Sequence, residues 1–161
     1  MQLDRIDFAL LQQLRTNARL PNKTLAERAG IAPSTALERV RRLHEAGVIK
    51  GYHAEIAPGA IGIGLQAMIS VRLERHSRQE VAAFNVHLQT LREVLAFYHV
   101  AGADDFLVHV AVHDSDHLRD FVLDAFTTRP EVSRIETSLI FAFQRNPGVP
   151  VYDAAPTCRR A

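Results

Sequence analysis

The chain has 161 residues, of which 47% are hydrophobic and 23% charged, and its formal net charge is +1. This composition is typical of a folded soluble protein and excludes wholesale disorder. The length suits one medium domain or two small ones. No apolar run approaches the roughly 18 residues of a membrane-spanning helix, so we expect no membrane segment or membrane partner.

The start of the sequence and its cysteine content point to one compartment. The first residues lack the basic start and apolar stretch of a secretory signal. The single cysteine, Cys158, cannot form an intrachain disulfide, and we expect an incidental thiol in a C-terminal tail over residues 146–161. We therefore expect a cytoplasmic protein.

Charge is divided unevenly along the chain. Residues 1–51 carry nine Lys and Arg against five Asp and Glu, whereas residues 52–161 carry ten against thirteen. A basic front and an acidic rear indicate two modules with different partners, and the front is the candidate for binding a polyanion.

The basic front predicts three short helices. Apolar residues recur at helical spacing over residues 4–15, with Asp4 as the N-cap. A second helix is expected over residues 23–29, ended by Gly30. A third begins at Pro33, whose missing N–H is tolerated at a helix start, and runs to the glycine at position 47. The second and third helices, joined by a short turn, predict a helix-turn-helix.

The third helix is the candidate for entering the DNA major groove. We expect it to bury Leu37, Val40 and Leu43. The residues expected to contact DNA are Ser34, Thr35, Glu38, Arg39, Arg41 and Arg42. Hydroxyls bind phosphates or bases, and arginines bind phosphates or guanine edges. Arg41 lies about 100° around the helix from its neighbours, so we expect it to reach a flanking phosphate or an acidic partner. The alternative is a structural three-helix cap with a solvated face.

The rear of the chain changes character. Residues 52–64 predict an extended segment and a glycine-rich hinge, followed by a second domain over residues 65–145. Its expected elements are strands at 65–74, 94–101, 106–113 and 132–143, and helices at 78–91 and 116–127. This order is the ferredoxin-like βαββαβ arrangement. The predicted fold class is α+β: a three-helix, winged-type helix-turn-helix domain and a domain with an antiparallel sheet, whose uncovered face favours a dimer.

Several motifs carry a family resemblance. The front contains LDxxD at 3–7, LA at 25–26, RVRRL at 39–43 and GVIKGY at 47–52. Together they resemble the N-terminal region of the Lrp/AsnC transcription regulators, also called feast/famine proteins. The rear resembles that family's ligand-binding and oligomerisation module, and the likeness covers about residues 2–145. It implies a sequence-specific bacterial DNA-binding regulator, dimers joined through the rear domains and assembly into an octamer. A small effector, usually an amino acid, tunes the assembly or the DNA affinity.

The resemblance also implies an effector site between dimers. The family's G-x-x-D-[YF] pattern is met by Gly102, Ala103, Asp104, Asp105 and Phe106. N–H groups of such a turn bind a carboxylate, and the aspartates suit an ammonium group. Thr137 and Ser138 on the last strand are further candidates. The alternative is that the segment is only a polar hairpin. The family often has serine where this chain has Ala32, which cannot accept a capping hydrogen bond.

Two other functions stay open. His99, His109 and His113 could ligate a metal or haem on neighbouring strands, and bacterial haem-pathway decarboxylases resemble this architecture. No phosphate loop, GxGxxG, CxxC or HExxH motif supports an enzyme, so we expect no catalytic residue, metal site or cofactor. The other alternative is an amino-acid-sensing module whose front binds protein instead of double-stranded DNA. Only binding to DNA predicts an affinity that falls steeply with salt.

Overall fold

The computed structural model describes residues 2–75 and 77–144. The described residues form two compact units, one over residues 2–54 and the other over residues 55–143. Cys158 and the tail expected over residues 146–161 lie outside the described residues. Within the described part, no helix combines the length and apolarity needed to cross a membrane. The functional limits expected for the two domains, at residues 51 and 65, stay a prediction.

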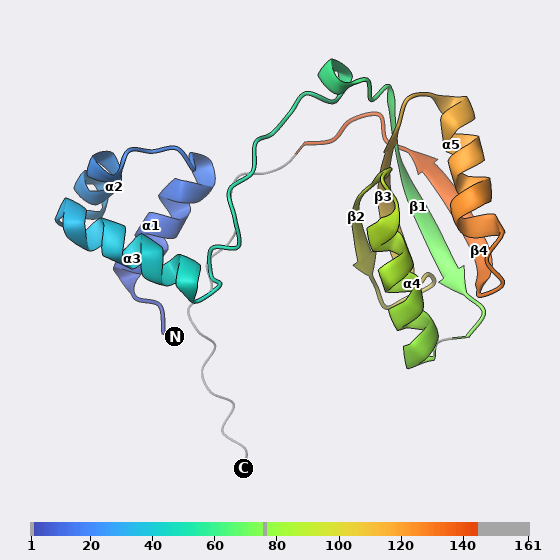
Figure 1. Ribbon diagram of the computed structural model, residues 1–161, viewed down its shortest axis with the longest axis horizontal. Helices are drawn as coiled ribbons and strands as arrows, with labels where there is room; N and C mark the ends of the chain where they lie inside the picture. The colour runs from blue at the N-terminus through green and yellow to red at the C-terminus, as the bar shows by residue number, and fades with distance from the viewer. Residues whose placement is uncertain (1, 76, 145–161) are drawn as a thin grey trace, which may run out of the picture. The chain divides into compact units, whose positions relative to one another are not determined.

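The first unit is built from the three predicted helices, α1 (Arg5–Thr16), α2 (Asn22–Ala29) and α3 (Pro33–Glu45) (Figure 1). Asp4 caps α1, because its carboxylate accepts hydrogen bonds from the N–H groups of Ile6 and Asp7. The Asp7 carboxylate accepts the N–H of Asp4 in return, which completes a capping box. The start of α1 is thereby fixed by two aspartates at once.

The turn between α2 and α3 follows the predicted chemistry. Gly30 ends α2 at a φ of 67°, a conformation that side chains with a Cβ rarely adopt. Pro33 occupies the first turn of α3, and Ala32 before it makes no side-chain capping bond. The expected burial of Leu37 is wrong: its side chain is 62% exposed, whereas Ala36 is fully buried. No strand follows α3 among residues 46–54.

The second unit contains one antiparallel sheet and two helices. Its elements are β1 (Leu65–Leu73), α4 (Arg78–Thr90), β2 (Val94–His99), β3 (Phe106–Val112), α5 (Ser115–Val122) with a π-helical turn (Leu123–Thr127), and β4 (Val132–Leu139). The strands lie in the order β2-β3-β1-β4 (Figure 1). This is the ferredoxin-like βαββαβ order, so the predicted α+β fold class is confirmed. The segment before β1 contains a single 3₁₀ turn, Pro58–Ile61.

The two faces of this sheet differ. On one face, alternate residues of β1 and β3 are buried under α4 and α5, and the rings of Phe84 and Phe106 lie 4.9 Å apart. On the other face, Met68 and His109 lie opposite each other on β1 and β3. The chain after β4 leaves Phe141 95% exposed. His109 is nevertheless only 9% exposed, and the ring of Phe143, from the chain after β4, lies 5.6 Å from its ring.

Candidate nucleic-acid interface and effector site

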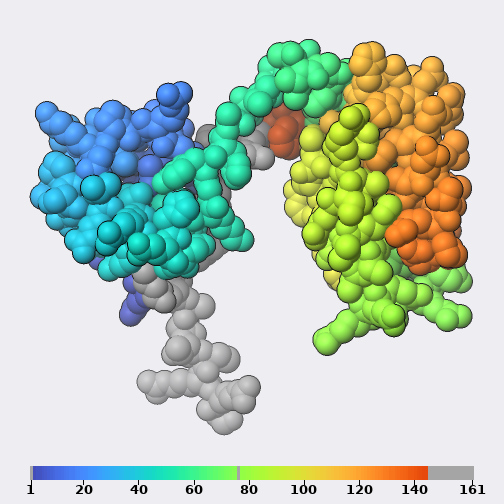
Figure 2. All heavy atoms as spheres, viewed as in Figure 1, coloured from blue at the N-terminus to red at the C-terminus, as the bar shows by residue number. Residues whose placement is uncertain are grey.

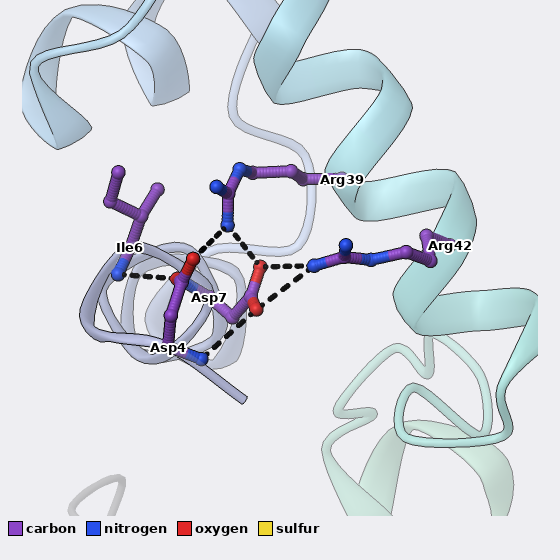
Figure 3. Close-up of polar contacts among 5 residues, drawn as sticks. All are labelled: Asp4, Ile6, Asp7, Arg39 and Arg42. Carbon is purple, nitrogen blue, oxygen red and sulfur yellow. Dashed lines mark hydrogen bonds and ion pairs between the residues drawn. The ribbon is translucent and has the colours of Figure 1, made fainter. Parts of the chain in front are cut away.

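Two arginines of α3 are held by the two aspartates at the start of α1 (Figure 3). Arg39 Nη1 donates hydrogen bonds to Asp4 Oδ2 at 2.7 Å and to Asp7 Oδ1 at 2.8 Å. Arg42 Nη2 donates to the two Asp7 oxygens at 3.2 and 3.1 Å. The Asp7 side chain is only 1% exposed, so this contact is the buried centre of the cluster. The cluster pairs two negative with two positive side chains and ties α1 to α3.

The cluster favours the charged forms of Asp4 and Arg39. The backbone N–H of Asp7, followed by the guanidinium of Arg39, lowers the pKa of the Asp4 carboxyl. Hydrogen bonds to Asp4 and then to Asp7 raise the pKa of Arg39. Both shifts favour the ionised forms and therefore the ion pair between Asp4 and Arg39.

Two of the α3 residues expected to contact DNA lie partly inward. The Arg39 side chain turns toward α1 and is 22% exposed, and Thr35 is half-buried. Ala36 takes the inward position expected for Leu37, while Leu43 is fully buried as expected and Val40 packs against the same core.

A different set of residues faces outward. Ser34, Leu37, Glu38 and Arg41 are all exposed on α3, which reaches the surface of the first unit (Figure 2). Arg41 is 73% exposed. It was expected to reach a phosphate or an acidic partner, and within the chain it pairs with Glu45 at an N–O distance of 3.4 Å. Exposed pairs of this kind contribute little stability, so Arg41 is available to an anion. An open hollow on this side of α3 is lined by Ser34, Leu37, Glu38, Val40, Arg41 and His44.

The residues expected to bind the effector in the hairpin between β2 and β3 differ in exposure. Gly102 and Ala103 are exposed, and Asp104 is half-buried. Asp105 is 7% exposed: its carboxylate accepts the N–H of Leu73 at 2.8 Å, and its own N–H donates to a carbonyl of β1 at 2.9 Å. Asp105 thus pins the hairpin to the end of β1.

Phe106 and the β4 candidates are also separated from the open part of the hairpin. Phe106 is fully buried in the core against Phe84. Thr137 and Ser138 are exposed on β4, but β1 lies between β4 and β3, because Ile69 pairs with Thr137 on one side and with β3 on the other. Two strand spacings amount to about 10 Å. The described residues of one chain therefore do not bring all the effector candidates together.

The histidines do not form a common site. His99 pairs with Phe106 and lies on the face toward the helices, whereas His109 lies on the opposite face. His109 Nε2 lies 2.8 Å from Gln66 Oε1, and burial lowers the pKa of His109. His113 pairs with the adjacent Asp114 at 2.9 Å. Across the residues that the structure describes, no cluster of three or more His, Cys, Asp or Glu is placed to hold a metal.

Comparison with known proteins identifies the family. A model described as "Winged helix-turn-helix DNA-binding" matches residues 3–50, and a model described as "Lrp/AsnC ligand binding domain" matches residues 66–144. The HTH-type transcriptional regulator AldR of Mycolicibacterium smegmatis is 48% identical over 143 residues, which cover 89% of this chain and 84% of that protein. The chain belongs to the Lrp/AsnC family of transcriptional regulators. The predicted resemblance is confirmed.

Other Lrp/AsnC proteins support the same assignment. The leucine-responsive regulatory protein of Escherichia coli K12 is 32% identical over 138 residues, which cover 86% of this chain and 84% of that protein. A transcriptional regulator of Neisseria meningitidis in complex with L-Met superposes with a TM-score of 0.84 at 30% identity, covering 92% of this chain and 97% of that one. The family comprises regulators and not enzymes, which sets the decarboxylase alternative aside.

Proposed function

We propose that this Lrp/AsnC regulator binds the major groove of double-stranded DNA through the outward side of α3. The observation that carries the proposal is that Asp7 and Asp4 fix Arg39 from behind, while Ser34, Glu38 and Arg41 stay exposed on the helix. Ser34 and Glu38 suit base edges, since a glutamate accepts a hydrogen bond from a cytosine amino group.

The remaining α3 residues would act at the edges of the interface. Arg41 and Arg42 suit flanking phosphates, and Arg42 is half exposed even though it contacts Asp7. Thr35 and Arg39 would support the helix from its inner side and would not reach bases.

We propose that a small amino-acid-like effector tunes DNA binding or assembly. The L-Met complex of the Neisseria meningitidis relative supports this ligand class. The exposed hairpin residues Gly102 and Ala103, with the half-buried Asp104, suit the charged groups of such a ligand. Because Thr137 and Ser138 lie two strands away in the same chain, they would contribute from a neighbouring copy.

We propose a homodimer as the basic unit, which assembles further to an octamer. The sheet face without helices supports a second copy as its cover, since Phe143 lies against His109 on this face and is still 58% exposed, and Phe141 beside it in the chain is 95% exposed. An effector site between dimers would then couple ligand binding to assembly.

Salt dependence of DNA binding tests the DNA half of the proposal. Fluorescence anisotropy with a labelled duplex, at low and at moderate salt, should give an affinity that falls steeply with salt, because phosphate contacts release counterions. Arg119→Ala on α5, a substitution of another exposed arginine, should leave both affinity and slope unchanged. Absence of binding, or binding that is insensitive to salt, would favour a protein partner for the front unit.

A thermal-shift screen against the amino acids tests the effector half. A ligand that binds only the folded protein stabilises it by about 2.7 kcal/mol at 100-fold excess over its dissociation constant. We expect at least one amino acid to raise the unfolding midpoint and to change the oligomeric state or DNA affinity. If no amino acid raises the unfolding midpoint and none changes the oligomeric state or the DNA affinity, the effector half of the proposal is wrong.

A further inference from the structure

We propose that Leu37 is a specificity-determining residue of this regulator and that it recognises the methyl group of a thymine in the major groove. The inference rests on the proposed docking of α3 into that groove. It adds an apolar base contact to the polar contacts of Ser34 and Glu38.

The position of Leu37 is unusual for α3. Its side chain is 62% exposed, whereas Ala36 and Leu43 on the same helix are fully buried. The expected inward position of Leu37 is filled by Ala36, so Leu37 is left without a place in the core of the first unit. A single exposed leucine is common on protein surfaces, so its exposure alone does not indicate a binding role.

The neighbours of Leu37 give its exposure a direction. Ser34 precedes it by three residues and Arg41 follows by four, so both lie beside it on one side of the helix. These three side chains line the same hollow. Leu37 is the fifth residue of α3 counted from Pro33, within the N-terminal half that enters the groove in helix-turn-helix proteins.

The major groove offers one kind of partner to an apolar side chain. The major-groove edges of the base pairs present hydrogen-bond donors and acceptors, and the C5-methyl of thymine is their apolar group. Arg41 beside Leu37 complements the negative charge of the backbone, and its exposed pair with Glu45 yields readily to a phosphate. The ion pairs with Asp4 and Asp7 hold Arg39 away from this side, which leaves Leu37 room to approach a base.

Deoxyuridine substitution tests the inference, since deoxyuridine pairs as thymine does and lacks only the methyl group. A duplex is selected from a random pool with the full chain, and each thymine is then replaced in turn. Wild-type affinity should fall about fourfold at one thymine of each half-site, the loss expected for one buried methyl. Leu37→Ala should bind the duplexes with thymine and with deoxyuridine at that position equally.

Val48→Ala is the matched control, because Val48 is an exposed apolar residue of the same unit, 39% exposed, that lies beyond the end of α3. It should keep the fourfold sensitivity. Thermal unfolding verifies that Leu37→Ala is folded, as expected for a side chain outside the core.

The outcomes separate the two levels of the proposal. If the wild type binds the selected duplex but responds to no thymine replacement, or if Leu37→Ala keeps the wild-type response, Leu37 does not recognise a methyl group while DNA binding stands. A change of oligomeric state in Leu37→Ala with an unchanged response would instead assign Leu37 to a contact with a second copy of the chain. If no duplex is selected at all, the proposed DNA-binding function fails as well.

Discussion

Replacing the buried Asp7 is the strongest single test of whether the ion-pair cluster stabilises the first unit. Asp7→Asn removes the charge that holds Arg39 at 2.8 Å and Arg42 at 3.1 Å. Removing one partner of a buried ion pair costs about 3–5 kcal/mol when the other charge stays buried and unpaired. Here Arg39 keeps its bond to Asp4 and Arg42 is 50% exposed, so both arginines retain a partner or water. We therefore expect a smaller loss, about 2 kcal/mol.

This loss should be visible as a lower unfolding temperature of the first unit. One kcal/mol shifts the midpoint of a small domain by about 4–8 °C, so the expected fall is about 8–16 °C. Calorimetry of the full chain measures the midpoint, and hydrogen exchange of the α1 and α3 amides locates the change.

The control for Asp7→Asn is Asp4→Asn. Asparagine caps a helix as well as aspartate does, and Asp4 is 52% exposed, so its loss should be much smaller. Equal effects of Asp4→Asn and Asp7→Asn, or unchanged exchange in α1 and α3 of Asp7→Asn, would refute the assignment of Asp7 as the buried centre of the cluster.

Three further predictions concern the second unit. Asp105→Ala leaves an N–H of β1 without its acceptor and should cost about 1–3 kcal/mol in an unfolding titration; an unchanged midpoint would remove its role in pinning the hairpin. Gly64→Ala would place a Cβ 2.3 Å from the His113 carbonyl oxygen and should lower the melting temperature, whereas Gly59→Ala meets open space and should not. Burial lowers the pKa of His109, so the folded state resists its protonation. The contribution of neutral His109 to the free energy of unfolding is therefore fully present above a pH of about 6.5 and falls as the pH drops toward the folded pKa. His109→Gln should flatten this fall relative to wild type in thermal scans across that range, and parallel curves for the two proteins would contradict it.

The sequence predicted most of the fold because local chemistry decides it. Asp4 at the start of α1, Gly30 after α2 and Pro33 at the start of α3 each satisfy a requirement of the helix terminus itself. Alternating apolar residues likewise located the strands. The burial of Leu37 was mispredicted, because the hydrophobic pattern does not show that the small side chain of Ala36, and not that of Leu37, fits against the other helices.

The contacts that the sequence did not show at the sites share another cause, which is distance along the chain. Arg39 and Asp7 are 32 residues apart, as are Asp105 and Leu73, so no local pattern shows that they bond. The faces taken by histidines on neighbouring strands depend on the register between the strands, and the pairing of β2 with β3 shifts near the start of β2. In these cases the residue type was informative, but its partner was set by tertiary structure.

The central claim is that the outward side of α3, and not Arg39, contacts DNA. The most direct measurement is the slope of the logarithm of DNA affinity against the logarithm of salt concentration for wild type, Arg41→Ala and Arg39→Gln. Removing one phosphate interaction reduces the steepness of this slope by about 0.9. We predict this reduction for Arg41→Ala and an unchanged slope for Arg39→Gln. A shallower slope for Arg39→Gln together with an unchanged slope for Arg41→Ala would contradict the claim.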